Sequence, residues 1–183
     1  MLEAEQDFIE KAKAGDSAAF GHLYDHYIKQ IYRFIALKVG TKETAQDLTH
    51  EVFMSAWQKL PNFKSQGFPF SSWLYTIARN KVIDHYRTKK SHVSIDDDGV
   101  IESDLLQSNV RTDELFDLQL SITKVHEALG QLTGEQREVI TMRFVSDLSP
   151  AEIAQILNKR EGTVRIIQYR AIQKLKKILE EHP

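Results

Sequence analysis

Apolar residues recur at intervals of three and four along most of this 183-residue chain, and this spacing constrains the fold more than any other feature. The clearest run comprises Phe20, Leu23, Tyr24, Tyr27, Ile31, Phe34 and Ile35. No stretch shows the alternation with a period of two that is typical of a half-buried strand. The sequence therefore predicts an all-α fold.

Capping residues, glycines and prolines predict where the helices begin and end. In the first half, we expect helices over residues 7–14, 17–39, 41–60 and 71–87. In the second half, we expect a helix over 113–129 and three shorter helices after it. Thr133 with Gln136 and Ser149 with Glu152 have the spacing of capping boxes, and Pro150 suits a first helical position.

Charge is distributed unevenly, although the whole chain carries a net charge of only −2. Residues 61–92 hold six basic residues and one acid, whereas residues 93–121 hold one basic residue and eight acids. We therefore predict two small helical bundles, 1–90 and 113–183, joined by a flexible acidic linker, 91–112. The acids at 96–98 and 102–104 could form a solubilising spacer or imitate a nucleic-acid backbone.

The segment 149–179 predicts a helix-turn-helix. A brief helix with apolar Ile153, Ala154, Ile156 and Leu157 ends at Asn158, and another begins near Arg160. Val164, Ile167, Ala171, Leu175 and Ile178 fall on one face of the second helix, which we expect to be core. The opposite face is cationic, so it could enter a DNA major groove. A solvated helix in a bundle, or a protein contact, is the alternative.

Three motifs together resemble the sigma-70 family of bacterial RNA polymerase sigma factors. Ser149-Pro-Ala-Glu-Ile-Ala-Gln-Ile-Leu, followed by Gly162-Thr-Val, is similar to region 4.2. Asp47-Leu-Thr-His-Glu-Val-Phe-Met-Ser-Ala-Trp resembles region 2.2, and Ser72-Trp-Leu-Tyr-Thr-Ile-Ala-Arg-Asn-Lys resembles regions 2.3 to 2.4. With domains 2 and 4 alone, the chain resembles the extracytoplasmic-function (ECF) subgroup. The resemblance implies a subunit that binds core polymerase and directs initiation by recognising −10 and −35 elements.

The resemblance also implies residue roles in the first half. Contacts with the polymerase β′ clamp fall to Asp47, Glu51, Met54 and Gln58, whose two acids lie four apart and repel each other unless a basic partner offsets them. A solvated helix face is the alternative. Recognition of the −10 element falls to Asn62, Phe63, Lys64, Trp73, Asn80, Lys81 and Arg87. Aromatic, amide and cationic groups suit single-stranded DNA, although Trp73 and Ile77 could instead be core and Asp84 could pair with a nearby arginine.

Recognition of the −35 element falls to Arg160, Glu161, Thr163, Arg165, Ile166, Tyr169 and Arg170. Arginines can reach guanine edges or phosphates, and Ile166 could meet a thymine methyl group. Ile166-Ile167 departs from the Ser-Arg that many relatives carry, so these contacts cannot be copied wholesale.

The sequence favours no catalytic, metal or cofactor site. The chain has no Cys, phosphate loop or HExxH motif, and His22 with His26 lacks a third ligand at fixed spacing. An acidic start and the lack of long apolar runs favour a cytoplasmic protein without direct membrane insertion. The implied partners are core polymerase (β′ clamp and β flap), promoter DNA and an anti-sigma factor. A stand-alone helix-turn-helix regulator with an N-terminal sensory domain and a helical metal-dependent hydrolase remain alternatives.

Overall fold

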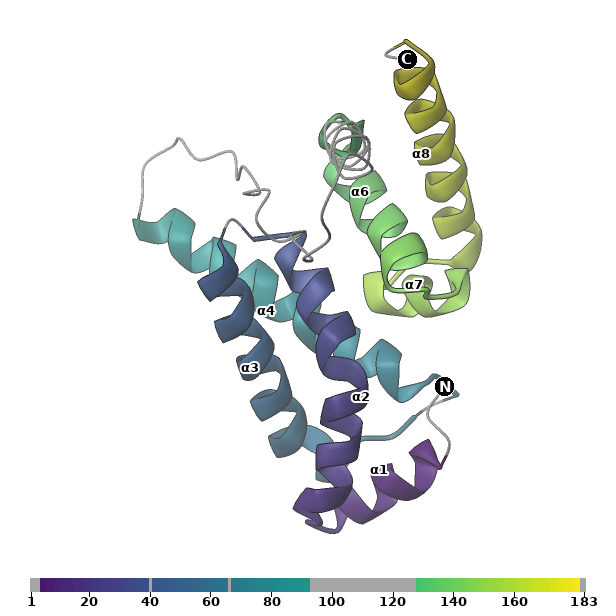
Figure 1. The fold of residues 1–183 in the computed structure, drawn as a ribbon. Helices are drawn as coiled ribbons and strands as arrows, with labels where there is room; N and C mark the ends of the chain where they lie inside the picture. The colour runs from purple at the N-terminus through teal and green to yellow at the C-terminus, as the bar shows by residue number, and fades with distance from the viewer. Residues whose placement is uncertain (1–3, 40, 66, 93–127, 182–183) are drawn as a thin grey trace, which may run out of the picture. The chain divides into compact units, whose positions relative to one another are not determined.

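The computed structural model describes residues 4–39, 41–65, 67–92 and 128–181, and every regular element in these ranges is helical (Figure 1). This confirms the all-α prediction. Packing contacts divide the chain into two compact units, Met1–Leu105 and Leu106–Pro183, which are described separately. Most of the predicted linker 91–112 and of the predicted helix 113–129 lies outside the described residues.

The first unit consists of four α-helices and one 3₁₀ turn. They are α1 (Glu5–Lys13), α2 (Ser17–Ala36), α3 (Lys42–Lys59), η1 (Leu60–Asn62) and α4 (Phe70–His92). The carboxylate of Asp16 accepts hydrogen bonds from the N–H groups of Ala18 and Ala19 at the start of α2 (2.9 and 3.1 Å). Thr41 caps α3 through the N–H of Thr44. These caps satisfy backbone donors that a helix leaves unpaired at its first turn.

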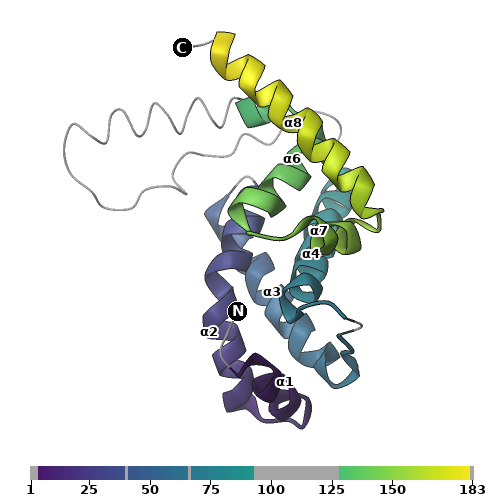
Figure 2. The ribbon, with the colours of Figure 1, turned by 90° about the vertical axis from the view of Figure 1, so that its right-hand side faces the viewer.

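Helix α2 is central to this unit because it packs against α1, α3 and α4. Figure 1 shows α4 crossing behind α2 and α3, and Figure 2, turned by 90°, shows α4 to the right of them. Leu23, Ile31 and Phe34 of α2 are fully buried, as are Leu74 and Tyr75 of α4. Each such side chain contributes about 1.5–3 kcal/mol by leaving water. Leu23, Ile31 and Phe34, which belong to the apolar run at 20–35 in the sequence, therefore lie on the buried face of α2.

Helix α4 is longer than predicted at both ends, since it begins at Phe70 and continues past Arg87 to His92. No glycine or proline occurs between Pro69 and Gly99, so the sequence offers no strong stop near Arg87. The first two residues of the predicted linker, 91 and 92, are thus helical. The Tyr86 hydroxyl donates to the backbone carbonyl of Lys38 (2.5 Å), which fastens this part of α4 to the segment after α2.

In the described part of the second unit, residues 128–181, helical residues 128–130 precede three further α-helices and a π-helical segment. They are α6 (Gly134–Ile140), η3 (Thr141–Val145), α7 (Pro150–Leu157) and α8 (Glu161–Glu181). Both predicted capping boxes are present, at Thr133 with Gln136 and at Ser149 with Glu152. The prediction of three short helices is wrong for α8, which has 21 residues. Leu175 and Ile178 prolong its apolar face and keep it packed.

A left-handed residue makes the turn between α7 and α8. Asn158 has φ 52° and ψ 49°. Its N–H donates to the carbonyl of Gln155 (3.1 Å), and the N–H of Lys159 donates to the carbonyl of Ala154 (2.8 Å). This pair of bonds is the Schellman pattern that ends a helix within two residues. The predicted helix-turn-helix is confirmed, with α8 as its second helix.

Ion pairs and buried side chains hold the second unit together. The ammonium group of Lys159, in the turn, lies 2.6 Å from the carboxylate of Glu135 at the start of α6. Ile153 of α7, Val164 and Ala171 of α8 and Val139 of α6 are buried. None of the described helices combines the length and apolarity needed to cross a membrane.

Candidate functional site

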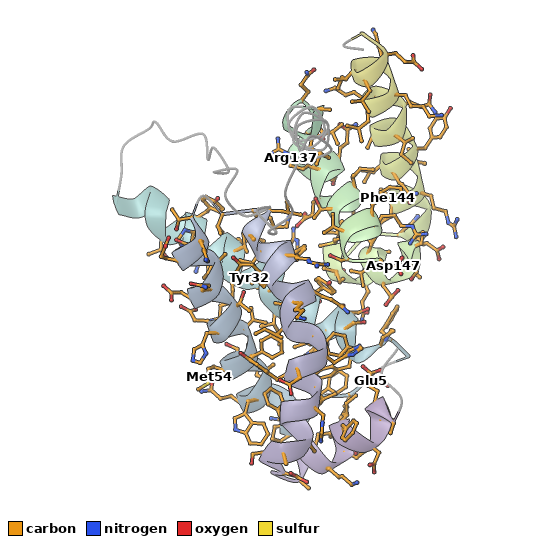
Figure 3. All side chains as sticks on the ribbon, in the orientation of Figure 1. Glu5, Tyr32, Met54, Arg137, Phe144 and Asp147 are labelled. Carbon is orange, nitrogen blue, oxygen red and sulfur yellow. The ribbon has the colours of Figure 1, made fainter. Side chains whose placement is uncertain are left out.

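The four residues predicted to bind core polymerase form one exposed stripe on α3, the α3 stripe (Asp47, Glu51, Met54 and Gln58). They are spaced by four, three and four residues, which places them on one face of a helix. The side chain of Met54 is 48 % exposed and stands on the outer side of α3 (Figure 3). An exposed methionine among acidic and amide groups is typical of a protein-binding surface rather than a core.

An ion pair joins the α3 stripe to α4. The ammonium group of Lys81 lies 2.9 Å from the carboxylate of Glu51. Lys81 therefore supplies the positive charge that offsets the repulsion between Glu51 and Asp47. The structure thus brings together one residue predicted to bind polymerase and one predicted to bind the −10 element.

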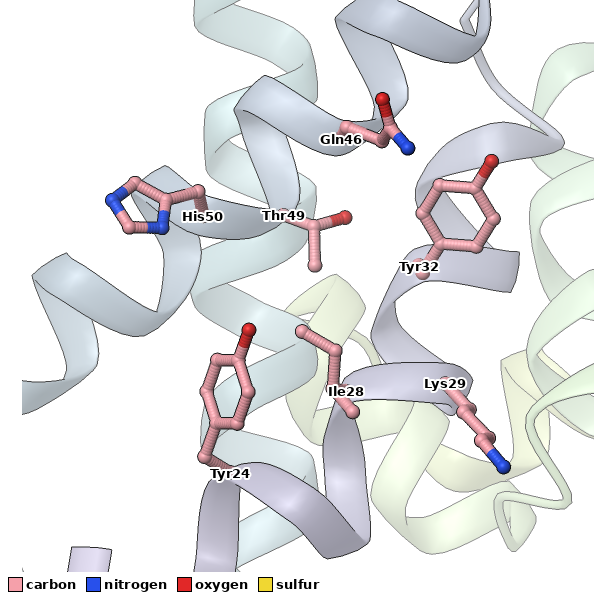
Figure 4. Close-up of a pocket in the computed structure, with 7 residues that line it drawn as sticks. All are labelled: Tyr24, Ile28, Lys29, Tyr32, Gln46, Thr49 and His50. Carbon is pink, nitrogen blue, oxygen red and sulfur yellow. The ribbon is translucent and has the colours of Figure 1, made fainter. Parts of the chain in front are cut away.

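A shallow pocket of about 430 Å³ lies between α2 and α3, beside the α3 stripe (Figure 4). Its lining residues are Tyr24, Ile28, Lys29, Tyr32, Gln46, Thr49 and His50. Gln46 of the pocket precedes Asp47 of the stripe in the chain, and His50 of the pocket precedes Glu51. The pocket and the stripe therefore adjoin along α3. The lining is mostly apolar with hydroxyl and amide groups, which suits an inserted side chain of a partner.

The loop before α4 is anchored by packed aromatic rings. Phe63 is only 8 % exposed, and its ring centroid lies 4.8 Å from that of Trp73 and 5.6 Å from that of Phe70. Trp73 is half-buried. Both rings were predicted to meet −10 DNA. In this structure they pack against each other and against Phe70. Asn62 and Lys64, on either side of Phe63, are exposed.

The exposed face of α4 carries Asn80, Asp84 and Arg87. Ile77, one turn earlier, is buried at 7 % exposure, which confirms the core alternative for that residue. A guanidinium nitrogen of Arg87 lies 3.2 Å from the carboxylate of Asp84, as the alternative for Asp84 expected. The Arg87 side chain nevertheless remains 80 % exposed, so it stays accessible to a phosphate.

In the second unit, every residue predicted to read the −35 element is exposed. We call this set the α8 face; it comprises Arg160, Glu161, Thr163, Arg165, Ile166, Tyr169 and Arg170. Ile166 and Tyr169 are 54 % and 63 % exposed, although both are large hydrophobic side chains. Val164, Ile167 and Ala171, on the opposite side, are buried. Within the described residues, this separation leaves the cationic side of α8 exposed.

The cations of the second unit differ in their partners. Arg165 donates from Nε and Nη2 to one carboxylate oxygen of Glu161, at 3.0 and 2.6 Å. Lys174 donates to the carbonyl of Gln131 (2.5 Å). Within the part of the chain that the structure describes, Arg160 and Arg170 have no ion-pair partner. These two arginines therefore carry the least compensated positive charge of the α8 face.

The structure also reveals an exposed apolar pair that the sequence analysis missed. Phe144 and Val145 are 62 % and 43 % exposed at the end of the π-helical segment (Figure 3). The guanidinium of Arg143 lies 6.0 Å from the Phe144 ring. Two adjacent apolar residues in a predicted helix are ordinarily assigned to the core, so periodicity gave no signal for their exposure.

The histidines considered as metal ligands pack against aromatic rings. The ring centroid of His22 lies 4.7 Å from that of Phe8, and that of His26 lies 4.6 Å from that of Tyr27. Among the described residues, no group of three or more histidine, cysteine or carboxylate side chains is arranged to hold a metal ion.

Comparisons with known proteins agree with the two-unit organisation. The family model for sigma-70 region 2 matches residues 23–92, and that for sigma-70 region 4 matches residues 128–177. The chain is 36 % identical over 175 residues to the ECF RNA polymerase sigma factor BldN of Streptomyces coelicolor, covering 96 % of this chain and 66 % of BldN. It is 32 % identical over 180 residues to the ECF RNA polymerase sigma factor SigW of Bacillus subtilis, covering 94 % of this chain and 95 % of SigW.

Solved structures share the fold. CnrH, solved with the cytosolic domain of CnrY, aligns with a TM-score of 0.73 over 98 % of this chain and 99 % of CnrH, at 24 % identity. The sigma factor RpoE from Bartonella quintana, solved with the anti-sigma factor NepR, aligns with a TM-score of 0.66 over 90 % of this chain and 98 % of RpoE, also at 24 % identity.

The match to region 2 accounts for the half of the chain that a stand-alone regulator would use as a sensory domain, so that alternative is not favoured. The match to region 4 accounts for the helix-turn-helix. The alignment with SigW covers nearly the full length of both chains, so it includes both regions in one protein. The chain belongs to the ECF group of the sigma-70 family of RNA polymerase sigma factors.

Proposed function

We propose that the two units divide promoter-directed initiation between them, with the first unit binding core polymerase and the −10 element and the second unit reading the −35 element. The observation that carries this proposal is the α8 face, an exposed cationic surface on the second helix of a helix-turn-helix. DNA-binding proteins place that helix in the major groove. In this proposal the polymerase performs the chemistry in the cytoplasm, and this subunit is neither an enzyme nor cofactor-dependent.

At the −35 element, the α8 face offers both phosphate and base contacts. Arg160 and Arg170, whose charges are uncompensated in the described ranges, suit backbone phosphates. Ile166 is an apolar group of the kind that meets a thymine methyl, and Arg165 can reach a guanine edge. Tyr169 has enough exposed surface to pack against the sugar-phosphate backbone or a base.

At the −10 element, exposed polar groups lie on the loop before α4 and along α4. Asn62, Lys64 and Asn80 are exposed, and Arg87 extends from the next turns of α4. The ammonium group of Lys81 is paired with the carboxylate of Glu51. We assign Phe63 and Trp73 chiefly to supporting this loop, because their rings pack together. The exposed part of Trp73 can still stack on a base, an interaction worth about 1–3 kcal/mol per base.

For core polymerase, the α3 stripe and the adjoining pocket offer acidic and apolar groups side by side. The exposed carboxylates of Asp47 and Glu51 can attract a basic partner, and Met54 adapts to partner surfaces. We assign this surface to the β′ clamp. In the second unit, Phe144 and Val145 supply an apolar patch outside the α8 face, which we assign to the β flap.

A protein inhibitor is a further expected partner. CnrH was solved with the cytosolic domain of CnrY, and RpoE of Bartonella quintana with the anti-sigma factor NepR. An anti-sigma factor for this chain would need to cover the surfaces that polymerase uses. The exposed apolar groups Met54 and Phe144 are the natural places for such a partner to bind.

Run-off transcription with core polymerase and a promoter library tests the proposal. We expect promoter-selective RNA only when both the chain and core polymerase are present. The variant Asp47→Arg with Glu51→Arg should lose core binding, because it turns the acidic stripe basic. A matched control, Asp7→Arg with Glu10→Arg on α1, reverses two exposed acids elsewhere in the same unit and should retain binding. Undiminished binding by the α3 variant would remove the placement of the β′ contact.

A further inference from the structure

The first turn of α8 contains an ion pair whose geometry bears on base recognition. Nε and Nη2 of Arg165 both donate to Oε1 of Glu161, at 3.0 and 2.6 Å. The two side chains are 65 % and 44 % exposed, so the pair lies on the α8 face and not beneath it. Among the described residues, Glu161 and Arg165 form the ion pair that lies within the α8 face.

This contact fixes which edge of the guanidinium remains free. Arg has five N–H donors in a planar fork. Two donors on the Nε side are taken by Glu161, which leaves the two N–H groups of Nη1 and the second N–H of Nη2. Two adjacent donors on that outer edge match the O6 and N7 acceptors of guanine in the major groove. The ion pair therefore leaves the outer edge of the Arg165 guanidinium available for a bidentate contact with a base.

The same contact weakens the attraction of Arg165 for the DNA backbone. The Glu161 carboxylate offsets the charge of Arg165 and repels a phosphate that approaches the same edge. Arg160 and Arg170 lack such a carboxylate in the described ranges and remain suited to phosphates. The α8 face thus separates into a charge-compensated arginine and two uncompensated ones.

We propose that Glu161 is a specificity-determining positioning residue, which holds Arg165 for a guanine edge within the −35 element and keeps it from backbone phosphates. This inference rests on the proposed −35 role of the α8 face. Spacing alone does not establish it, since Glu four residues before a basic residue is a favourable arrangement on any exposed helix. The test must therefore measure base discrimination and not merely stability or affinity.

The experiment uses the full chain with core polymerase and a promoter library randomised across the −35 element, with Glu161→Gln, Arg165→Ala and the double variant. Arg165→Ala should lower discrimination at one base pair by about 5- to 150-fold, the range of a lost bidentate contact. Glu161→Gln, which keeps the shape and removes the charge, should lower discrimination at that same base pair by about two- to fivefold, because an exposed ion pair couples its partners only weakly. In the Arg165→Ala background, Glu161→Gln should change nothing further.

A salt titration gives a second readout. In Glu161→Gln, Arg165 is released from its carboxylate and should add about one phosphate contact on non-specific duplex DNA. The slope of the logarithm of the DNA-binding constant against the logarithm of the salt concentration should therefore steepen by about 0.9. The matched control is Glu135→Gln, which frees Lys159 from its 2.6 Å ion pair in the same unit but off the α8 face. This control should leave base preference unchanged.

The outcomes separate the inference from the proposed function. If Arg165→Ala loses discrimination while Glu161→Gln retains it, the positioning role is wrong and the −35 assignment stands. If Glu161→Gln acts equally in the presence and absence of Arg165, Glu161 reads a base by itself and the positioning role is again wrong. If neither variant changes base preference, the −35 role of the α8 face fails as well.

Discussion

The turn of the helix-turn-helix should depend on the left-handed backbone of Asn158, with φ 52° and ψ 49°. A residue with a Cβ incurs about 1–2 kcal/mol in this conformation, because Cβ approaches the following carbonyl oxygen. Asparagine tolerates the conformation better than most residues, and a β-branched residue tolerates it poorly. The substitution Asn158→Val should therefore destabilise the second unit, whereas Asn158→Gly should not.

The expected magnitude follows from that cost. Asn158→Val should lower the free energy of unfolding of the second unit by about 1–2 kcal/mol. Asn158→Gly removes the steric cost but adds unfolded-state entropy of about 0.5–1 kcal/mol, so its net effect should be close to zero. The matched control is Gln155→Val, an exposed position of α7 with right-handed backbone. That substitution changes only helix propensity, by about 0.5 kcal/mol or less.

Hydrogen exchange of the α7 and α8 amides in the full chain is the appropriate assay. Both tryptophans, Trp57 and Trp73, lie in the first unit, so tryptophan fluorescence does not report on the second. A loss of 1–2 kcal/mol corresponds to exchange about 5- to 30-fold faster. Exchange in Asn158→Val that matches the Gln155→Val control would show that the turn does not constrain the unit and would refute this reasoning.

Three further variants test other parts of the fold. Ser149→Ala removes the side-chain cap of α7 and should lower the stability of the second unit by about 1 kcal/mol, measured by the same amide exchange. Phe34→Ala empties a fully buried site whose ring centroid lies 5.2 Å from that of Tyr75; it should lower the stability of the first unit by about 3–5 kcal/mol, followed by tryptophan fluorescence in urea. The hydrogen bond that the Lys11 ammonium donates to the Asp7 carboxylate, together with the charge of that carboxylate, raises the pKa of Lys11 above its ordinary 10.5, so the pair stabilises the chain below that pH and the effect is lost as pH rises through the raised value. Asp7→Asn should return the Lys11 pKa towards 10.5 in an NMR titration.

Local sequence signals predicted the features of the fold that depend on neighbouring residues. The capping boxes at Thr133 and Ser149 each need only four consecutive residues, and both are present. The buried and exposed sides of α8 follow from a single helical period. The early predicted end of α4 was wrong because the sequence near Arg87 contains no residue that breaks a helix, and polar composition alone does not end one.

Features that depend on distant residues could not be predicted in the same way. The ion pair between Glu51 and Lys81 spans 30 positions and depends on how α3 packs against α4. The burial of Phe63 depends on a ring contact with Trp73 across a loop. Phe144 is exposed on a π-helical segment, and no property of the residue itself indicates this exposure.

Ion pairs give a physical reason why a chain with DNA-binding surfaces can carry a net charge of −2. Of the six candidate DNA-binding cations, Lys81, Arg87 and Arg165 are each paired with a carboxylate of the same chain. Exposed pairs of this kind are worth about 0–1 kcal/mol, so a phosphate can replace the carboxylate beside Lys81 or Arg87 at little cost, whereas Arg165 keeps its carboxylate and offers the outer edge of its guanidinium to a base. They lower the attraction for arbitrary DNA while leaving the cations available at a matched site. The charge that matters for recognition is therefore the local charge left after pairing, and the whole-chain value conceals it.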